Sequence, residues 1–519
     1  MEKREEAIQG HQGVNPQNTA PDEITQASSR DWDETYKVFK QQDGVEIDAR
    51  EAQRVLRKID WHIMPLLMGS YMLQYLDKSC INFASVYGLQ QGTNLHDQQY
   101  SWLTSIFYFG YLVAQYPAGY LLQRLPVGKF MGSCTIVWGI LIITTPACKS
   151  FAGIATNRFL LGVFEAVVNP GFVLIMAMWY TKAEQPLRLV TYYCMNGFAG
   201  IFGGLLGYAI GHINSGLGRW MYVFLIFGAI SLVWGIIFTF FMPDLPTTTR
   251  FLSVPETVVA VERVAANRQG VKNHHFKKYQ MWQTFRDPKT WILFVMGIAA
   301  QIPNAAQTTF TAIILKTFGF NTLQTQYMQI PGNVVQIVSL LLSGWIASRW
   351  PNIRCIVMTA GNLICVACGA VLVGLNPGPD GTSNRWGRLV ALWLCSIQSV
   401  GFSLSLTMVS SNVAGYTKKQ LTAAFLFIAY CVGNIIGPQT FKDSEAPFYH
   451  SAYTAILIGY SVKTIMVLVL YAYMWSVNKK RDRAAAADPR SAEELEQEAV
   501  EMGMRDVTEI DNKGFRYVL

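Results

Sequence analysis

The sequence predicts an all-α membrane protein with twelve transmembrane helices in two pseudo-symmetric six-helix bundles. Three observations predict this fold class: an apolar composition, twelve long apolar runs, and one long polar break that divides the runs six and six. The chain has 519 residues, of which 51% are hydrophobic and 15% are charged, and its mean hydropathy is +0.22. This balance is typical of a protein that folds in lipid rather than in water.

Twelve apolar runs approach the length of about 20 residues that a helix needs to cross a bilayer core of about 30 Å. They span residues 61–83, 100–121, 128–147, 152–179, 188–212, 220–242, 290–314, 325–347, 353–375, 387–411, 421–441 and 451–475. Each run is expected to form one transmembrane helix.

The longest interior break, residues 243–289, sets the domain plan. It is expected to be a cytoplasmic linker with a helix of its own near 255–268. It separates an N-terminal six-helix bundle, residues 60–242, from a C-terminal six-helix bundle, residues 290–478. A duplicated six-helix unit explains this division.

Polar tails flank the two bundles. Residues 1–59 have mixed charge and lack the short apolar core of a cleavable signal peptide, so we expect a disordered cytoplasmic tail. Residues 479–519 are expected to form a second cytoplasmic tail, disordered from Ala484 onward except for a short helix near 492–502.

The basic residues of the loops predict the orientation. With a cytoplasmic N-terminus, the inside loops and the cluster after the last run carry twenty Lys and Arg, whereas the outside loops carry six. Both termini are therefore expected in the cytoplasm. The same asymmetry accounts for the formal net charge of +8 and gives no reason to expect a nucleic-acid partner.

Two corresponding loops share a pattern. GYLLQRLPVGK (119–129) follows the second run and GWIASRWPNIR (344–354) follows the eighth, each with a Gly at the helix end and two basic residues five apart. They resemble degenerate forms of the loop signature of the major facilitator superfamily, with Gln123 and Ser348 where an Asp is usual. The resemblance implies two bundles that alternately open a central cavity.

Three longer stretches narrow the resemblance. RFLLGVFEAVVNPGF (158–172), ERVAANRQGVKNHHFKKYQMWQTFRDPKTW (262–291) and SNVAGYTKKQLTAAFLFIAYCVGNIIGPQTF (411–441) resemble the fungal anion:cation symporters, most closely their allantoate permease-like branch. This resemblance implies a transporter of small organic anions.

Few charged residues lie inside the apolar runs: Asp77, Lys78, Arg158, Glu165 and Lys463. A charge at bilayer depth costs at least about 2.5–3.5 kcal/mol, so such residues normally face a bundle interior or a watery cavity. Four of the five lie in the N-terminal bundle. We therefore expect the functional site in that bundle.

Helical periodicity groups these charges. In the fourth run Arg158, Gly162, Glu165 and Asn169 recur at i, i+4, i+7 and i+11, which places them on one face. In the first run Tyr71, Gln74, Tyr75 and Lys78 share a face, whereas Asp77 is turned about 100° away. The expected directions of the two helices put Lys78 and Arg158 at a similar depth.

Two cations at one depth repel each other unless carboxylates or an anionic ligand balance them. We therefore expect Lys78 and Arg158 to hold a substrate carboxylate, and Glu165 to carry a coupled proton. The resembled family usually has Arg at the Lys78 position, and its residues at these three positions act in anion binding and proton coupling. The alternative is a set of structural ion pairs, which we favour for Asp77, the second candidate for proton coupling.

The remaining charge, Lys463, lies in the twelfth run. It is expected to snorkel toward the inner surface or to form a buried pair, and not to contact substrate.

The C-terminal half offers neutral polar groups. Asn304 and Gln307, with Gln301, form one edge of the seventh run, and Pro303 is expected to interrupt the helical hydrogen bonding there. Asn434 lies beside Gly433, and Asn412 lies three residues before Gly415. Asn304, Gln307 and Asn434 are candidates for binding the uncharged part of a substrate, or equally for satisfying a kinked backbone.

The fifth run is rich in glycine. NGFAGIFGGLLGYAIG (196–211) contains overlapping GxxxG spacings, which predict the close approach of another helix.

Enzyme motifs are not found. The nine cysteines lie in or beside apolar runs without a metal-binding pattern, and no ATP-binding GxxxxGK[ST] sequence occurs. We expect neither a metal nor another cofactor.

The sequence therefore predicts a monomeric secondary transporter, favoured in the plasma membrane, that takes up a small organic anion with a proton. Two alternatives stay open: an exporter or vacuolar carrier of the same fold, and a nutrient sensor that binds ligand without transport.

Overall fold

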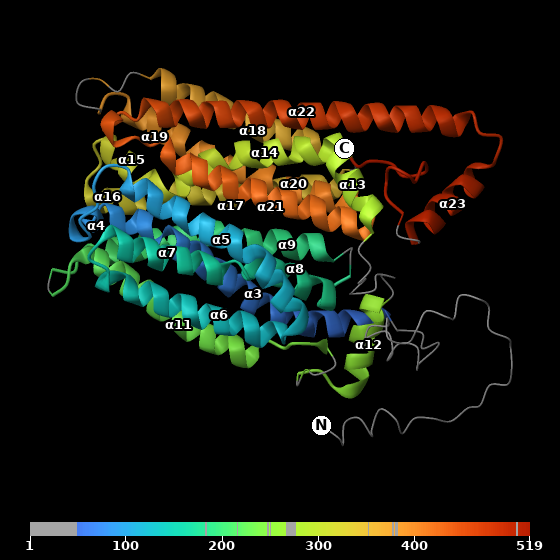
Figure 1. The fold of residues 1–519 in the computed structure, drawn as a ribbon, viewed down its shortest axis with the longest axis horizontal. Coiled ribbons are helices and arrows are strands. Elements are labelled where there is room, and N and C mark those ends of the chain that lie inside the picture. Colours follow the sequence, from blue (N-terminus) through green and yellow to red (C-terminus); the bar gives the residue numbers. More distant parts are fainter. Residues whose placement is uncertain are drawn as a thin grey trace.

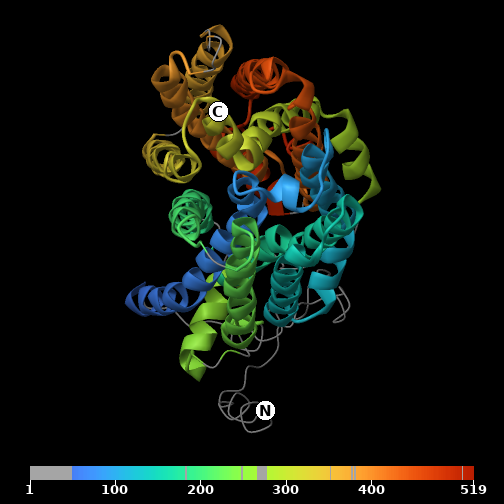
Figure 2. The ribbon, with the colours of Figure 1, turned by 90° about the vertical axis from the view of Figure 1, so that its left-hand side faces the viewer.

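The computed structural model describes residues 49–519 apart from 182–183, 215, 247–248, 250, 266–276, 351, 376–377, 379–381 and 505–506. All regular secondary structure in this part of the chain is helical. The helices form two elongated halves that lie side by side (Figures 1 and 2). The expectations for residues 1–48 and for the middle of the linker lie outside the described residues. Residues 49–59, expected to belong to the disordered tail, are helical instead and form the start of the first long helix.

The N-terminal half holds the first six predicted spans. In chain order they are α3 (Ala49–Ser85), α5 (Gln99–Arg124), α6 (Val127–Thr144), α7 (Phe151–Glu165) with α8 (Val168–Trp179), α9 (Gln185–Tyr193) with α10 (Met195–Ile210), and α11 (Arg219–Phe241). Within this half α6 packs on α11, α5 packs on α7, and α3 packs on α10 and α11. A short helix, α4 (Leu89–Gly92), follows α3 at one end of the molecule.

The C-terminal half holds the other six spans. They are α14 (Pro288–Ala305) with the π-helical turn η4 (Ala306–Phe310) and α15 (Thr311–Thr317), α16 (Thr322–Tyr327) with α17 (Ile330–Arg349), α18 (Arg354–Gly374), α19 (Arg385–Leu394) with η5 (Cys395–Ile397) and α20 (Gln398–Asn412), α21 (Tyr416–Gln439), and α22 (His450–Ala486). The π-helical turn begins three residues after Pro303, where an interruption was predicted. The twelve-helix fold class is confirmed.

Nine spans in the described part of the chain are long and apolar enough to cross a membrane by length and composition alone. The other three are α3, α5 and the column from α14 to α15. These three carry polar side chains toward the interface between the two halves, which lowers their mean hydropathy.

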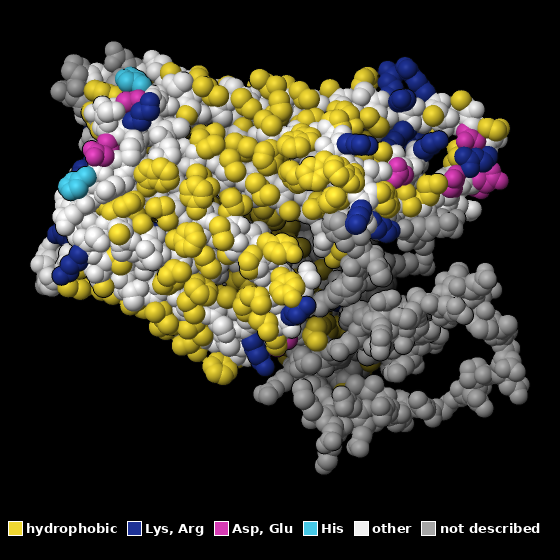
Figure 3. Space-filling view, viewed as in Figure 1, with side chains coloured by type: hydrophobic (Ala, Val, Ile, Leu, Met, Phe, Trp, Pro, Cys, Tyr) yellow, Lys and Arg dark blue, Asp and Glu magenta, His cyan; other side chains and the backbone are white. Residues whose placement is uncertain are grey.

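The two halves meet closely at the end that carries α4 and α16. The Tyr100 hydroxyl on α5 donates to the Thr309 carbonyl at 2.9 Å, and the Ser105 hydroxyl donates to the Ile435 carbonyl at 2.8 Å. Phe310 stacks on Phe441 with ring centroids 4.0 Å apart. Figure 3 shows the surface hollowed between the halves toward the opposite end, where α12 lies.

The glycine face of α10 forms part of this closed end. A Cβ at Gly204 would lie 2.8 Å from the Gln326 carbonyl oxygen, and one at Gly207 would lie 2.5 Å from the Gln326 side-chain oxygen. Only glycine permits helices to approach this closely. The predicted close helix approach is confirmed, and its partner is the segment from α16 to α17.

The linker helix α12 (Val254–Ala265) lies against the N-terminal half, and a second linker helix, α13 (Lys278–Arg286), leads into α14. Glu256 on α12 pairs with Lys58 of α3 at 2.7 Å. The predicted linker helix ran to residue 268, and residues 266–268 lie outside the described part.

Residues 507–519 dock on the C-terminal half, so the expectation of a disordered tail after Ala484 is wrong. Glu509 is fully buried, and its carboxylate contacts Lys289 of α14 at 2.6 Å and also contacts Lys418 of α21. The Asn412 side chain exchanges two hydrogen bonds with the backbone of Val518, at 2.9 Å and 2.7 Å. The docked segment thus adds a second carboxylate to the two lysines, which also pair with Asp287, and backbone partners to the Asn412 side chain.

The same tail includes a helix, α23 (Ala492–Met504), close to the one predicted near 492–502. α22 continues to Ala486, well past the predicted end of its membrane span.

Candidate functional site

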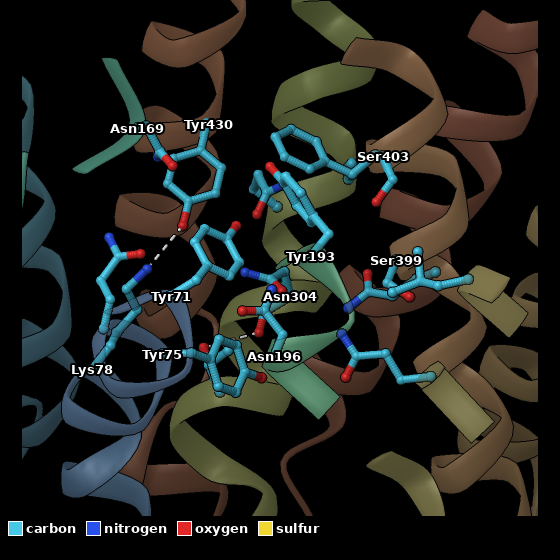
Figure 4. Close-up of a pocket in the computed structure, with 18 of the residues that line it drawn as sticks. Tyr71, Tyr75, Lys78, Asn169, Tyr193, Asn196, Asn304, Ser399, Ser403 and Tyr430 are labelled. Atoms are coloured by element: carbon cyan, nitrogen blue, oxygen red, sulfur yellow. Dashed lines mark hydrogen bonds between the residues drawn. The ribbon is translucent and has the colours of Figure 1, made fainter. Parts of the chain in front are cut away.

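A cavity lies between the two halves, and its empty space, including the part open to solvent, is about 810 Å³. Helices from both halves supply its lining: α3, α8, α9 and α10 from the first, and α14, α17, α20 and α21 from the second. Several lining residues are drawn in Figure 4. A second cavity of about 550 Å³ shares Tyr75, Thr308 and Gln336 with the first.

The predicted polar face of α3 lines the central cavity. Tyr71, Gln74, Tyr75 and Lys78 all contribute to its wall, as their helical spacing predicts. Among the described residues that line this cavity, Lys78 alone carries a charge. The other lining residues are neutral amides, hydroxyls, aromatics and small or aliphatic side chains.

Lys78 touches both halves of the molecule. Its ammonium group donates a hydrogen bond to the Tyr430 hydroxyl on α21 at 3.1 Å, as Figure 4 shows. It also lies 5.6 Å from the ring centroid of Tyr108 and 5.8 Å from that of Phe107, both on α5. Aromatic faces attract a cation but leave its charge uncompensated.

Arg158 and Glu165 belong to the interior of the N-terminal half. Both are buried on α7, and neither is among the described residues that line the two cavities. The Arg158 guanidinium lies 5.5 Å from the Phe224 ring centroid on α11. The structure therefore does not bring Arg158 together with Lys78 on the cavity wall.

Glu165 ends α7, and the helix resumes as α8 at Val168. Neither carboxyl oxygen accepts a hydrogen bond from a described residue. The charged groups that act on this carboxyl group are Lys78, Asp77 and Arg158. Glu165 thus lies behind the cavity wall, within electrostatic reach of Lys78, which faces the cavity.

Asp77 points away from the cavity, as its offset from Lys78 predicts. It is fully buried, and its Oδ2 atom accepts a hydrogen bond from the Trp138 indole of α6 at 3.1 Å. The Ser231 hydroxyl of α11 donates to the same oxygen. Asp77 therefore ties α3 to two neighbouring helices, which fits the structural role that we favour for it.

The neutral candidates of the C-terminal half form two hydrogen-bonded groups. Asn304 lines the central cavity and donates to Asn434 at 3.1 Å, and Asn434 donates in turn to Gln301 at 3.1 Å. Asn434 itself is fully buried behind the wall. Gln307 lines the second cavity and accepts a hydrogen bond from Gln398 at 2.8 Å.

Lys463 is 1% exposed, so it does not snorkel to the inner surface. Its ammonium group donates to the Gln398 carbonyl at 2.8 Å. The snorkelling interpretation is wrong because α22 packs its Lys463 face inward, on α14 and α18.

Sequence reasoning missed Tyr430 and Gln398, although both line the central cavity. Neither carries a charge or breaks an apolar pattern, so neither stands out in the sequence. Tyr430 lies four residues before Asn434 and therefore on the same helix face. This spacing could have identified Tyr430 as a candidate.

The described residues include no group of three or more His, Cys, Asp and Glu that could hold a metal. A cavity that is lined from both halves and closed at one end suits a small solute that passes between the halves.

Comparison with known proteins decides the family. A model of the Major Facilitator Superfamily matches residues 67–438. The chain belongs to this superfamily. An uncharacterized transporter of Schizosaccharomyces pombe is 35% identical over 519 residues, which cover 100% of this chain and 94% of that protein.

A second relative and a solved structure agree with this assignment. The allantoate permease of Saccharomyces cerevisiae is 32% identical over 498 residues, which cover 94% of this chain and 90% of the permease. The crystal structure of a D-xylose–proton symporter aligns with a TM-score of 0.60 over 79% of this chain and 97% of that chain, at 12% identity. That likeness shows the fold alone. The protein is a multi-pass membrane transporter of the major facilitator superfamily and not an enzyme, and it fits the allantoate permease-like branch.

Proposed function

We propose that this transporter moves a small organic anion, a carboxylate, together with a proton. One observation carries the proposal: Lys78 is the single charged side chain among the described residues that line the cavity between the two halves. Within the described part of the chain no carboxylate forms an ion pair with Lys78. A substrate carboxylate would supply the missing counter-charge.

The lining around Lys78 suits the uncharged part of such a substrate. Amides from both halves face the cavity: Gln74, Asn169, Asn196, Gln301, Asn304, Gln336 and Gln398. Each amide can donate and accept hydrogen bonds. A single cation among many neutral polar groups favours a substrate with one carboxylate and several polar groups, and the related allantoate permease is named for such an anion.

Glu165 supports proton coupling because its charge acts on Lys78 from behind the cavity wall. An ionised Glu165 competes with a substrate anion for the positive potential of Lys78 and Arg158. Protonation of Glu165 removes this competition and favours anion binding. By linkage, a bound anion favours protonation equally, so anion and proton are transported together.

Arg158 contributes to this proposal without touching the substrate. Its charge acts on Glu165 from the same helix. A fixed cation beside Glu165 makes loss of the proton easier when the substrate has left, because it stabilises the ionised carboxylate. Asp77 is proposed to hold α3 in place through Trp138 and Ser231.

The cavity is lined by residues of both halves, and this supports transport by alternating access. Lys78 belongs to the N-terminal half, whereas Tyr430 and Asn304 belong to the C-terminal half. A substrate bound between them contacts both halves, so its binding energy can drive their relative movement. We propose a monomer in the plasma membrane with both termini in the cytoplasm, which places the hollowed end toward the cytoplasm.

The test is uptake of labelled carboxylates by cells that express the full chain. The panel contains allantoate, other ureido acids and nicotinate, each measured with and without a protonophore. We expect proton-dependent accumulation of at least one anion. We also expect its loss in Lys78→Met and its partial retention in Lys78→Arg, which keeps the charge. Absence of proton-dependent uptake for every anion would refute the proposal.

A further inference from the structure

Lys463 is a buried cation that the proposed transport mechanism does not use. It lies in the middle of α22, and no carboxylate in the described part of the chain pairs with it. Burying an unpaired ammonium group is costly, so its surroundings must compensate the charge. The contact that does so is the Gln398 carbonyl, 2.8 Å from Nζ.

Gln398 marks a break in the tenth span. α19 ends at Leu394, the 3₁₀ turn η5 follows, and α20 starts at Gln398. A change of helix type leaves carbonyl groups without their regular partners. At this break two side chains of α22 donate to the carbonyls: Tyr460 to the Cys395 oxygen at 3.5 Å, and Lys463 to the Gln398 oxygen.

The tenth span is shaped to receive the lysine. A Cβ at Gly401 would lie 2.6 Å from both Cε and Nζ of Lys463. This distance is far below any real carbon contact, so a side chain at position 401 would push the ammonium group aside. Glycine at 401 and lysine at 463 therefore form one fitted contact between α20 and α22.

The side chain of Gln398 connects this contact to the cavities. It lines the central cavity and donates to Gln307 at 2.8 Å, and Gln307 lines the second cavity. Lys463 thus holds the backbone of Gln398, while the side chain of Gln398 faces the proposed substrate. Fixing the backbone at Gln398 fixes the point from which its side chain starts, and the hydrogen bond to Gln307 then sets the direction of the amide.

We infer that Lys463 is a positioning residue for substrate recognition: through the Gln398 carbonyl it holds the break of the tenth span and orients the Gln398 amide in the cavity. The claim that Lys463 affects substrate recognition rests on the proposed function. The claim that Lys463 holds the break of the tenth span is independent of that function. Because α22 lies outside the cavity wall, Lys463 acts on the substrate through Gln398 alone.

The first measurement needs no substrate. Hydrogen exchange of peptides covering residues 395–401 is compared in the purified full chain, Lys463→Met and Thr464→Val. Thr464 is the matched control, since it is buried beside Lys463 and its hydroxyl bonds its own helix at the Tyr460 carbonyl. We expect exchange about tenfold faster in Lys463→Met, corresponding to loss of one charged hydrogen bond, and no change in the control.

The second measurement is the concentration dependence of uptake, with labelled allantoate or the best-transported panel anion as the probe. Lys463→Met should raise KM about tenfold with a maximal rate, per transporter in the membrane, that changes far less. Gln398→Leu should also raise KM. Adding Lys463→Met to Gln398→Leu should have no further effect on KM, because the lysine acts through that amide.

Gly401→Ala tests the same contact from the opposite side. Its added Cβ should displace the lysine and reproduce both effects, which guards against a folding defect peculiar to Lys463→Met. Unchanged exchange at 395–401 in Lys463→Met would overturn the inference. Faster exchange with an unchanged KM would also overturn it, because Lys463 would then stabilise the bundle only. If no panel anion is taken up, the proposed function fails, while the exchange result still decides whether Lys463 holds the break.

Discussion

Lys78 of α3 donates a hydrogen bond to the hydroxyl of Tyr430 on α21, 3.1 Å away and 352 positions later in the chain. This contact joins the two halves across the cavity, at the single charged side chain among its described lining residues. The Tyr430 hydroxyl keeps its own hydrogen to donate to a bound carboxylate. Lys78 and Tyr430 can therefore hold an anion together, one from each half.

Tyr430→Phe should weaken substrate binding without abolishing it. The change removes one neutral hydrogen bond, worth about 0.5–1.5 kcal/mol, so KM for uptake of the panel anion should rise about two- to tenfold. Tyr116→Phe is the control, because Tyr116 is 84% exposed on the outer face of α5. An unchanged KM in Tyr430→Phe would exclude the hydroxyl from the site.

Glu165→Gln should separate exchange from accumulation. The amide cannot release a proton, so bound anion should still exchange across the membrane while uphill accumulation is lost. The apparent affinity for the anion should also stop improving as the pH falls. Asp77→Asn provides the contrast: it should lower thermal stability but keep proton-driven accumulation, since Asp77 bonds Trp138 and Ser231. Pumping by Glu165→Gln would contradict the assigned role.

Gly162→Ala should destabilise the N-terminal half. Its Cβ would lie 2.0 Å from the Phe107 carbonyl oxygen, so α5 and α7 would have to separate. Overpacking of this kind costs about 1–3 kcal/mol, measurable as a lower thermal midpoint in detergent. Gly119→Ala on α5 is the control, because no atom lies within 4 Å of its added Cβ. Equal midpoints for the two variants would contradict the close packing of α5 and α7.

Glu509→Gln should strongly destabilise the C-terminal half. Lys289 and Lys418 are both buried, and Glu509 is a shared carboxylate partner. Removing one member of a buried ion cluster costs about 3–5 kcal/mol, because the opposite charges stay buried. Deletion of residues 507–519 should have a similar effect on the thermal midpoint.

A surface pair in the same tail is the control for this prediction. Glu498 pairs with Arg490 at 2.6 Å, but both side chains are largely exposed. Glu498→Gln should change the free energy of unfolding by less than about 1 kcal/mol. A tail deletion that left the thermal midpoint unchanged would show that the docked segment is not part of the C-terminal half.

Asp287→Asn should show a pH-dependent stability defect. Burial opposes ionisation of Asp287, but Lys289 and Lys418 outweigh it and hold the pKa of this carboxyl below its ordinary value of 3.8. Since the folded-state pKa is the lower one, the carboxylate stabilises the fold fully above the ordinary value, and this contribution is lost as the pH falls through the lowered pKa. Asn keeps the capping oxygen that accepts from the Lys289 amide at 3.0 Å.

The thermal midpoint of Asp287→Asn should therefore lie below that of the natural protein at pH 7 by a difference that persists to pH 5. The difference should shrink only below the ordinary pKa of 3.8. A difference that grew as the pH fell would have the wrong sign and would remove the ion cluster as its cause.

Much of the fold could be predicted from the chain because lipid imposes simple rules. A helix must supply about 20 apolar residues to cross the bilayer, so the twelve spans are visible in one dimension. The 100° turn per residue likewise placed Lys78 and Tyr71 on one face and Asp77 on another, and the structure keeps that division.

The candidate site could be predicted only in part. The charges on α3 and α7 stand out because they are costly in lipid, but periodicity places a residue relative to its own helix and not relative to a distant one. Arg158 therefore appeared to share an anion with Lys78, whereas the packing of α7 on α5 directs it to the interior beside Phe224. Tyr430 and Gln398 carry no charge, so nothing local distinguished them.

The sequence by itself determined the number of spans and their division into two groups of six. It also determined which face of the first span carries Lys78. Each of these follows from local composition and helical periodicity. The tertiary structure alone decided that Tyr430 meets Lys78, that Lys463 is turned inward onto Gln398, and that Glu509 completes a buried ion cluster. These contacts join residues far apart in the chain, and the free energy of such a contact depends on what the other helices bury around it.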